Sequence, residues 1–334
     1  MTIDGWSVSL IAFGVTAILV PLVRAASIHV NWIHCPSPSN PRVIAMGGGL
    51  AIFAGILTAT TAVGHSHAPL LVLGLAGLAL LLGLWDDLKG CRPTAKLIIQ
   101  TLLGAATVLL VGRVDSLPAW LAIPVTIFGV VGLMNAVNIL DNMDGTASGL
   151  MTLAMLGYAG LGMVTQNSTI TVLSLAVAGA CFGFWLYNKP PASIFMGDAG
   201  SMTLGYLLSV VGTLATHGQY QNELARLIAP LLLADVFIAN TVFVTAWRKA
   251  HGLPITFWCL EHNLNYRVIA LVGPSPWKVN IAFYAVQVSL AILAWYSAVA
   301  PLLVTFAIFL LSAGSLFGLS WRLWQVAPES VHLR

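Results

Sequence analysis

Charged side chains are scarce in this chain. Lysine and arginine supply 14 residues and aspartate and glutamate 11, so only 7% of the 334 residues are charged. Soluble globular domains carry about 25%. Hydrophobic residues make up 58% of the sequence, and the mean hydropathy is +0.91. The composition therefore excludes an ordinary soluble protein and indicates an integral membrane protein.

Cysteine is also rare, with four residues at positions 35, 91, 181 and 259. They fall in connections that we expect to face the cytosol or inside a membrane span, and their spacing matches no metal-binding pattern. Because the cytosol is reducing, we predict neither a disulfide nor a zinc site. The net charge of +3 follows from membrane topology and requires no nucleic-acid partner.

Long apolar runs fill the rest of the sequence. A helix of about 17–25 apolar residues crosses a hydrocarbon core about 30 Å thick. The first run lacks a cleavage site and is interpreted as a retained span. We predict one all-α polytopic membrane domain over residues 1–334, with ten or eleven transmembrane helices. The expected spans are 6–23, 46–64, 69–85, 97–112, 118–134, 147–165, 169–187, 202–216, 225–246, 278–298 and 301–321.

The basic residues predict the orientation of these spans. Cytosolic loops of membrane proteins carry an excess of lysine and arginine. With the N-terminus outside, only Arg113 and Arg226 face outward, and we therefore expect a cytosolic C-terminus. The remaining basic residues are Arg24, Arg42, Lys89, Arg92, Lys96, Lys189, Arg248, Lys249, Arg267, Lys278, Arg322 and Arg334.

Five of the 11 acidic residues occupy helix ends on the predicted cytosolic side. Carboxylates near the membrane are costly unless they face water or bind a ligand. Clustered oxygen donors suit a divalent cation that holds phosphate groups. The five are Asp86 and Asp87 in GLWDDLKG, Asp141 and Asp144 in NAVNILDNMDGTASG, and Asp198 in FMGDAGSMTLG.

The pair Asp86 and Asp87 is adjacent, so on a helix the two side chains point about 100° apart. One can face a cavity while the other pairs with Lys89 or Lys96. A charge cluster that merely ends a helix has the same sequence pattern, and this alternative stays open.

Polar residues recur every three positions at the end of the fifth run. At helical spacing they predict one polar face, which a solvated helix cap alone does not explain. The residues are Asn135, Asn138, Asp141 and Asp144.

The segment NKPPASIFMGDAGS joins the seventh and eighth runs. Gly197 and Gly200 flank Asp198, which predicts backbone amides open to an anion beside a carboxylate that binds a cation. Further on, His262 and Arg267 lie in the polar loop HNLNYRV. This loop could reach over the aspartates and hold a phosphate or sugar, or it could be an ordinary solvated loop.

Taken together, the motifs NPRVIAMGGG, WDDLKG, NAVNILDNMDG and NKPPASIFMGDAGS resemble those of the polyprenyl-phosphate N-acetylhexosamine-1-phosphate transferases. The resemblance spans nearly the whole chain. It implies a phosphotransferase of the bacterial inner membrane that depends on Mg²⁺, with Mn²⁺ as an alternative. Such an enzyme transfers an amino-sugar-1-phosphate from a UDP-sugar to undecaprenyl phosphate and releases UMP. This is the first membrane step of a cell-surface polysaccharide, such as a cell-wall polymer or O-antigen.

The resemblance also implies roles for individual residues. Asp198 matches the magnesium-binding residue, and Asn188 and Phe195 match positions that hold the nucleotide, with the aromatic ring under uracil. Residues with an implied catalytic role are Asp86, Asp87, Asp141 and Asp144. Residues expected to bind substrate are Lys89, Lys96, Asn138, Asn188, Phe195, His262 and Arg267.

The sequence departs from the family pattern in two segments. Asn142 stands where the family has glycine, and Thr146 stands where it has leucine. The loop HNLNYRV replaces a histidine-rich H-x-H-H-R-L motif that touches substrate in the family, so only His262 and Arg267 correspond.

Two other functions remain as alternatives. The altered loop would suit a catalytically degenerate family member that acts as a scaffold. An ion-coupled transporter would instead need carboxylates near the bilayer midplane and two related halves. The sequence leaves open the donor sugar, the pathway and whether the protein is a homodimer.

Overall fold

The computed structural model describes residues 4–34, 42–62, 67–254 and 262–326. Within these ranges the chain forms twelve α-helices and a hairpin of the short strands β1 (Ile33–His34) and β2 (Ile44–Ala45). The helices are α1 (Asp4–His29), α2 (Gly48–Ala62), α3 (His67–Lys89), α4 (Pro93–Leu110), α5 (Ala119–Leu140), α6 (Thr146–Val164), α7 (Ser168–Asn188), α8 (Gly197–Ala215), α9 (Glu223–Ala250), α10 (Leu264–Val272), α11 (Pro276–Val299) and α12 (Leu302–Trp324).

The helices follow the apolar runs of the sequence. Each of the eleven expected spans corresponds to one helix, and the short α10 is additional. In the described part of the chain, nine helices are long and apolar enough to cross a membrane. The prediction of an all-α polytopic membrane protein is therefore confirmed.

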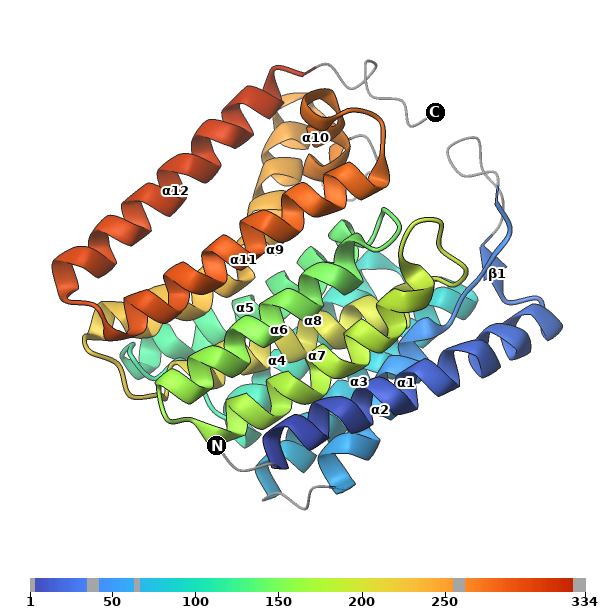
Figure 1. The fold of residues 1–334 in the computed structure, drawn as a ribbon, viewed down its shortest axis with the longest axis horizontal. Coiled ribbons are helices and arrows are strands. Elements are labelled where there is room, and N and C mark those ends of the chain that lie inside the picture. Colours follow the sequence, from blue (N-terminus) through green and yellow to red (C-terminus); the bar gives the residue numbers. More distant parts are fainter. Residues whose placement is uncertain (1–3, 35–41, 63–66, 255–261, 327–334) are drawn as a thin grey trace.

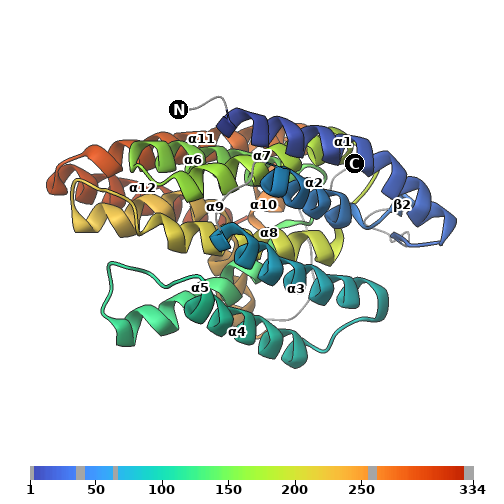
Figure 2. The same ribbon diagram turned by 90° about the horizontal axis from the view of Figure 1, so that it is seen from below.

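The bundle has three layers, seen most clearly in Figure 2. Helices α1, α6, α7 and α11 form one outer layer, and α3, α4 and α5 form the other. Between them lies α8, in which 15 of 19 residues are buried. By contrast, α12 lies at the edge of the bundle in Figure 1 and buries only four of its 23 residues.

Close backbone packing joins α3 to the start of α8. A Cβ added to Gly83 would lie 2.2 Å from the carbonyl oxygen of Asp198, well inside any allowed contact. Only glycine lets the two backbones approach this closely. The approach brings the end of α3, with its two aspartates, beside the first turn of α8.

The hairpin fixes the connection that leads into α8. Strand β2 pairs with β1 on one side, and Ala45 forms a bridge to Ile194 on the other. At the start of α2, the backbone N of Gly48 donates to the carbonyl of Phe195 at 3.0 Å. The loop that precedes Asp198 is therefore anchored to the N-terminal segment.

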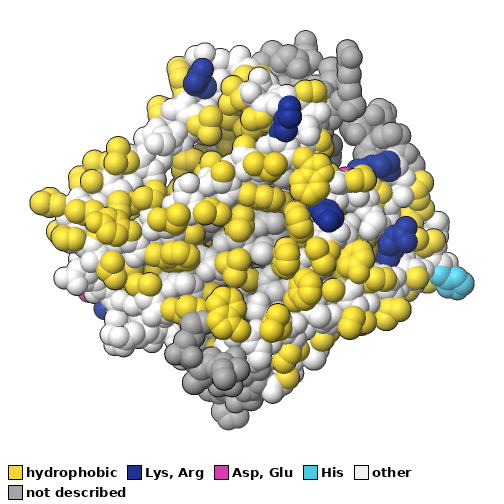
Figure 3. Space-filling model, in the orientation of Figure 1, with side chains coloured by type: hydrophobic (Ala, Val, Ile, Leu, Met, Phe, Trp, Pro, Cys, Tyr) yellow, Lys and Arg dark blue, Asp and Glu magenta, His cyan; other side chains and the backbone are white. Residues whose placement is uncertain are grey.

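The expected outward and cytosolic groups lie at opposite ends of the bundle. Arg226 is near the connection between α4 and α5, with its Nη1 3.3 Å from Asp115 Oδ2. On the face drawn in Figure 3, most of the visible lysines and arginines lie toward the other end, at the upper right, where α11 begins in Figure 1. This distribution agrees with the predicted orientation, which itself stays a prediction.

Candidate active site

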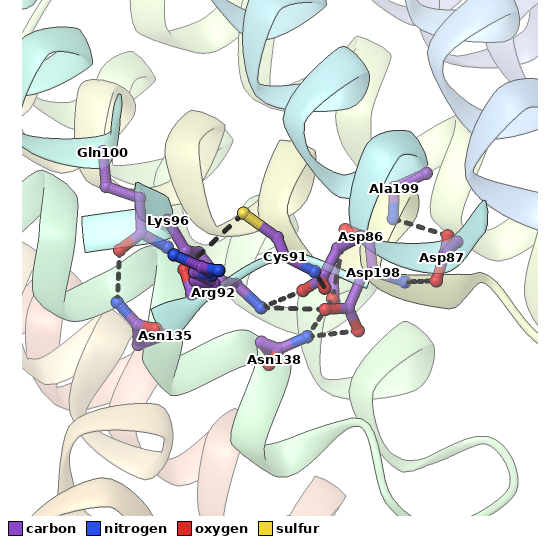
Figure 4. A network of polar contacts seen from close by, with 11 residues as sticks. Asp86, Asp87, Cys91, Arg92, Lys96, Gln100, Asn135, Asn138, Asp198 and Ala199 are labelled. Atoms are coloured by element: carbon purple, nitrogen blue, oxygen red, sulfur yellow. Dashed lines mark hydrogen bonds and ion pairs between the residues drawn. The ribbon is translucent and has the colours of Figure 1, made fainter. Parts of the chain in front are cut away.

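Lys96 bridges carboxylates from two different helices (Figure 4). Its Nζ lies 2.7 Å from Asp86 Oδ2 at the end of α3 and 2.8 Å from Asp198 Oδ2 in the first turn of α8. The Lys96 side chain is only 15% exposed. The other Asp86 oxygen accepts the backbone N–H of Cys91 at 2.7 Å. The predicted pairing with Lys96 is confirmed, whereas Lys89 is exposed and pairs with no carboxylate in the described ranges.

Asp87 caps the start of α8 from the neighbouring helix. Its two carboxylate oxygens accept the backbone N–H groups of Asp198 at 2.8 Å and Ala199 at 3.0 Å. Amides in the first turn of a helix have no partner inside the helix. Gly197 permits the contact, because its φ is +73° and a Cβ there would lie 2.5 Å from an Asp87 oxygen. The amides expected to face a substrate anion therefore bind Asp87 instead.

Asn138 reaches the same network from α5. Its Nδ2 donates to Asp198 Oδ1 at 2.8 Å and to Ser201 Oγ at 2.9 Å. Asn135, one turn earlier, donates instead to Gln100 Oε1 at 2.8 Å. Asn135 therefore supports the packing of α4 against α5 and does not contact Asp198.

The expected polar stripe does not continue beyond the end of α5. The helix ends at Leu140, and Asp141 is its C-cap residue with a ψ of +58°. Asp144 lies in the turn that follows. The interpretation as one helical face is therefore wrong, because the helical period stops before the two aspartates.

Asp141 is a half-buried carboxylate without a partner. Its side chain makes no hydrogen bond or ion pair with any other residue that the structure describes. Burial raises the pKa of this carboxyl to about 8. The nearby carboxylates of Asp198, Asp87 and Asp144 raise the pKa of Asp141 further.

Asp144 is held by the N-terminal segment. Its Oδ2 lies 2.7 Å from Arg42 Nη2 and accepts the backbone N–H of Ala192 at 2.9 Å. The Asp144 side chain is 11% exposed and that of Arg42 is 41% exposed. Sequence reasoning missed this role of Arg42, whose one signal was its place in the NPRVIAMGGG motif.

The donor set agrees with a magnesium ion only in part. Within the described ranges, no three histidine, cysteine, aspartate or glutamate side chains are grouped to hold a metal by themselves. Mg²⁺ usually binds through one or two carboxylates and completes its shell with waters and substrate phosphates. Asp141 and Asp198 supply oxygen donors of this kind, so the residues fit an ion shared with a phosphate-bearing substrate.

Asn188 and Phe195 form the framework beside these carboxylates. Asn188 is buried, and its Oδ1 accepts from the Ser148 hydroxyl at 2.8 Å and from the backbone N–H of Gly145 at 3.2 Å. Its Nδ2 donates to the carbonyl of Ile194 at 3.1 Å. Phe195 is half-buried and makes an edge contact with the ring of His34. Nucleotide binding by these two residues stays a prediction.

His262 and Arg267 both pack against Trp247 on α9, and Arg267 also contacts the segment that follows α12. The His262 ring packs on Trp247 with centroids 4.4 Å apart, and Arg267 lies 4.9 Å from the centroid of the same indole. Arg267 is fully buried and donates to the carbonyl of Val326. Burial lowers the pKa of His262 to about 4, with Arg248 and Arg267 acting in the same direction, so the ring is neutral near pH 7. Substrate contact by either residue stays a prediction.

Comparison with known proteins identifies the family. The model of glycosyl transferase family 4 matches residues 69–216. A probable undecaprenyl-phosphate N-acetylglucosaminyl 1-phosphate transferase of Bacillus subtilis is 30% identical over 286 residues, 77% of this chain and 78% of that protein. The chain belongs to the polyprenyl-phosphate sugar-1-phosphate transferases. The family expected from the motifs is thus confirmed.

A second branch of the transferase family is equally similar. A phospho-N-acetylmuramoyl-pentapeptide-transferase of Lactiplantibacillus plantarum is 31% identical over 276 residues, 74% of this chain and 81% of that protein. Similarity to both branches supports a membrane phosphotransferase without selecting a sugar. The family-model match contains all five site aspartates and leaves out Arg42 and α9–α12.

Proposed function

We propose that this transferase moves an N-acetylated amino-sugar-1-phosphate from a UDP-sugar to undecaprenyl phosphate and releases UMP. One observation carries the proposal: a lysine shared by two carboxylates lies in the same acidic site as a carboxylate without a partner, all at one end of the bundle. The family relationship supports it. The reaction would be the first membrane step of a cell-surface polysaccharide at the bacterial inner membrane.

The transfer joins a lipid and a water-soluble molecule. An oxygen of the acceptor phosphate attacks the phosphorus that carries the sugar, and the bond from that phosphorus to the bridging oxygen breaks. UMP leaves with the bridging oxygen, and the lipid retains a diphosphate bonded to the sugar. A phosphate monoester has a second pKa near 6, so the acceptor has already lost most of its protons at neutral pH.

The protein groups have distinct roles in this scheme. Lys96 offsets negative charge where the phosphates meet, while Asp86 and Asp198 hold its ammonium group. Asp87 positions Asp198 through the first turn of α8. Asp141, whose side chain no described residue binds, is left free to coordinate a cation.

We further propose that Asp198 and Asp141 hold Mg²⁺, or Mn²⁺, together with the substrate phosphates. When bound, the ion neutralises phosphate charge and polarises the phosphorus–oxygen bonds. The purified protein with its ion removed should regain activity when Mg²⁺ is added, and retention of full activity in excess chelator would contradict this assignment.

The decisive experiment incubates the purified protein with undecaprenyl phosphate and a panel of UDP-amino sugars while UMP is followed. At least one sugar should support turnover. Asp198→Ala should abolish it, whereas near-normal UMP release by this variant would remove Asp198 from the mechanism. Exchange of labelled UMP into the UDP-sugar without lipid would indicate a covalent intermediate instead of direct transfer.

A scaffold without catalytic activity is the second candidate function. Arg267 is expected to bind substrate, yet it is fully buried and presents no charge to solvent. A degenerate member would bind a UDP-sugar without releasing UMP. Calorimetric binding of the panel without turnover would therefore favour a scaffold.

A further inference from the structure

The turn of residues 141–145 carries two of the site aspartates, yet α11 holds its backbone. Asn280, fully buried on α11, donates from Nδ2 to the carbonyl of Asp144 at 2.8 Å. The Tyr284 hydroxyl donates to the carbonyl of Gly145 at 2.6 Å and accepts the indole N–H of Trp185 at 3.0 Å. Both contacts leave the Asp144 carboxylate to other partners.

Helix α10 holds the other side of the turn through Asn142. The side-chain amide of Asn265 donates to Asn142 Oδ1 at 2.6 Å, and the Tyr266 hydroxyl donates to the Asn142 carbonyl at 3.2 Å. Asn142 Nδ2 in turn donates to the carbonyl of Ile139 at 2.7 Å. Asn265 is fully buried, and its Oδ1 accepts the backbone N–H of Tyr266 at 3.0 Å. Asn142 is therefore fixed both to α5 and to α10.

We propose that the Asn142–Asn265 carboxamide pair positions Asp141 and Asp144 for the transfer. The two asparagines are called the amide clasp below. The clasp rests on the proposed function, and it makes both asparagines positioning residues rather than catalytic ones. Asn142 lies between the two aspartates in sequence, so a shift of Asn142 moves both.

The chemistry of the clasp suits this place. Two carboxamides form a donor–acceptor pair that is neutral at every physiological pH. A charged residue there would add to or cancel the field of the nearby carboxylates, which the clasp leaves unchanged. Asn142 and Asn265 also come from the two segments in which the sequence departs from its family, and the structure pairs them.

The position of a catalytic group affects the rate strongly, because a misplacement of about 1 Å can cost about a hundredfold. The loss of a hydrogen bond between buried groups typically changes the equilibrium constant for the ordered conformation by about tenfold. We therefore expect Asn142→Ala and Asn265→Ala each to lower kcat for UMP release about tenfold, with KM for the UDP-sugar changed less than about twofold.

A double-mutant cycle tests whether the two asparagines act together. The variant with both substitutions should be no slower than the slower single variant, because both remove the same contact. Multiplied effects, or single variants with unchanged kcat, would overturn the clasp. Tyr266→Phe removes one hydroxyl and serves if an alanine variant fails to fold; it should lower kcat about threefold. Tyr296→Phe, on an exposed part of α11, is the matched control and should leave kcat unchanged.

Hydrogen exchange gives a readout that does not depend on turnover. Asn265→Ala should speed amide exchange across residues 139–146, while Tyr296→Phe should not. Unchanged exchange would contradict the clasp. If the wild type turns over no UDP-sugar but exchange still responds to Asn265→Ala, the clasp stands as a structural device and the proposed function fails.

Discussion

At the scale of single residues, the site depends on how three charges are shared. Lys96 neutralises Asp86 and Asp198 together, so the bridged set retains one net negative charge. Asp141 adds a carboxyl that no described residue compensates, and because its pKa is raised to about 8 it becomes negative only as pH rises or a cation binds. The net negative charge of the bridged set attracts cations, which supports the proposed metal ion.

Loss of the lysine should be costly for turnover. Lys96→Gln removes a cation that contacts both Asp86 and Asp198, and removing a preorganised charge stabiliser costs about 10²–10³ in kcat. UMP release by the purified variant measures the effect. Lys249→Gln, an exposed lysine at the end of α9, is the control. A Lys96 variant with wild-type kcat would contradict the role given to the bridge.

Asp141 should make the ion-free protein less stable as pH rises. Its pKa is about 8 in the folded protein against 3.8 in an unstructured chain, so the folded state binds the proton more tightly. This contribution to stability is complete below about pH 4 and is lost as pH rises toward 8. In chelator, thermal unfolding of the wild type should therefore occur at lower temperature at pH 8 than at pH 5.

Asp141→Asn should flatten that dependence, because an amide does not titrate in this range. Asp115→Asn, at the opposite end of the bundle, should not. A wild type and Asp141→Asn variant with parallel pH profiles would show that another group controls stability.

At the scale of secondary-structure elements, one helix end is stabilised by its neighbour. The first-turn amides of α8 find their acceptor on α3. A carboxylate at a helix N-terminus is favourable for both hydrogen bonding and the helix dipole. Asp87 thus ties the placement of Asp198 to the packing of two helices.

Asp87→Ala should lower both stability and turnover. Loss of a capping side chain costs about 0.5–2 kcal/mol, and the freed start of α8 would let Asp198 move. Asp87→Asn keeps one acceptor oxygen and should lose less of both. Thermal unfolding and UMP release in the same detergent measure the two effects. Equal losses in the two variants would indicate that charge, and not capping, is what Asp87 supplies.

The limits of prediction from sequence also appear at this scale. The apolar runs and the pairing of an Asp86–Asp87 carboxylate with Lys96 were predictable, because hydropathy and near-neighbour charge are local properties. The contact between Asn135 and Gln100 was not, because the two residues lie on different helices. Nor was the break in the polar face, since the i, i+3 spacing gives no warning that α5 ends at Leu140. The contact between Asn142 and Asn265 joins residues more than one hundred positions apart and leaves no local pattern.

At the scale of the whole molecule, the five aspartates come from the end of α3, the turn between α5 and α6, and the start of α8, which meet at one end of a three-layer bundle. Alternation of the helices explains this meeting, because every second connection returns to the same end. The predicted orientation rests on the basic residues, most of which lie toward that end on the face drawn in Figure 3.

Cysteine labelling in a variant without native cysteines tests the orientation. Lys249→Cys, at the end of α9, should react with an impermeant maleimide only after the cells are opened. Glu223→Cys, at the start of the same helix and 76% exposed, should react in cells whose outer membrane alone is permeabilised. The reverse pattern would invert the topology and contradict a cytosolic site.

The contact of Gly83 with the carbonyl of Asp198 has a consequence for how this enzyme tolerates mutation. Even a methyl group at Gly83 would wedge α3 away from α8 and pull Asp86 off the shared lysine. Random mutagenesis should accordingly recover inactive variants at a residue with no chemistry of its own, one turn before the acidic pair.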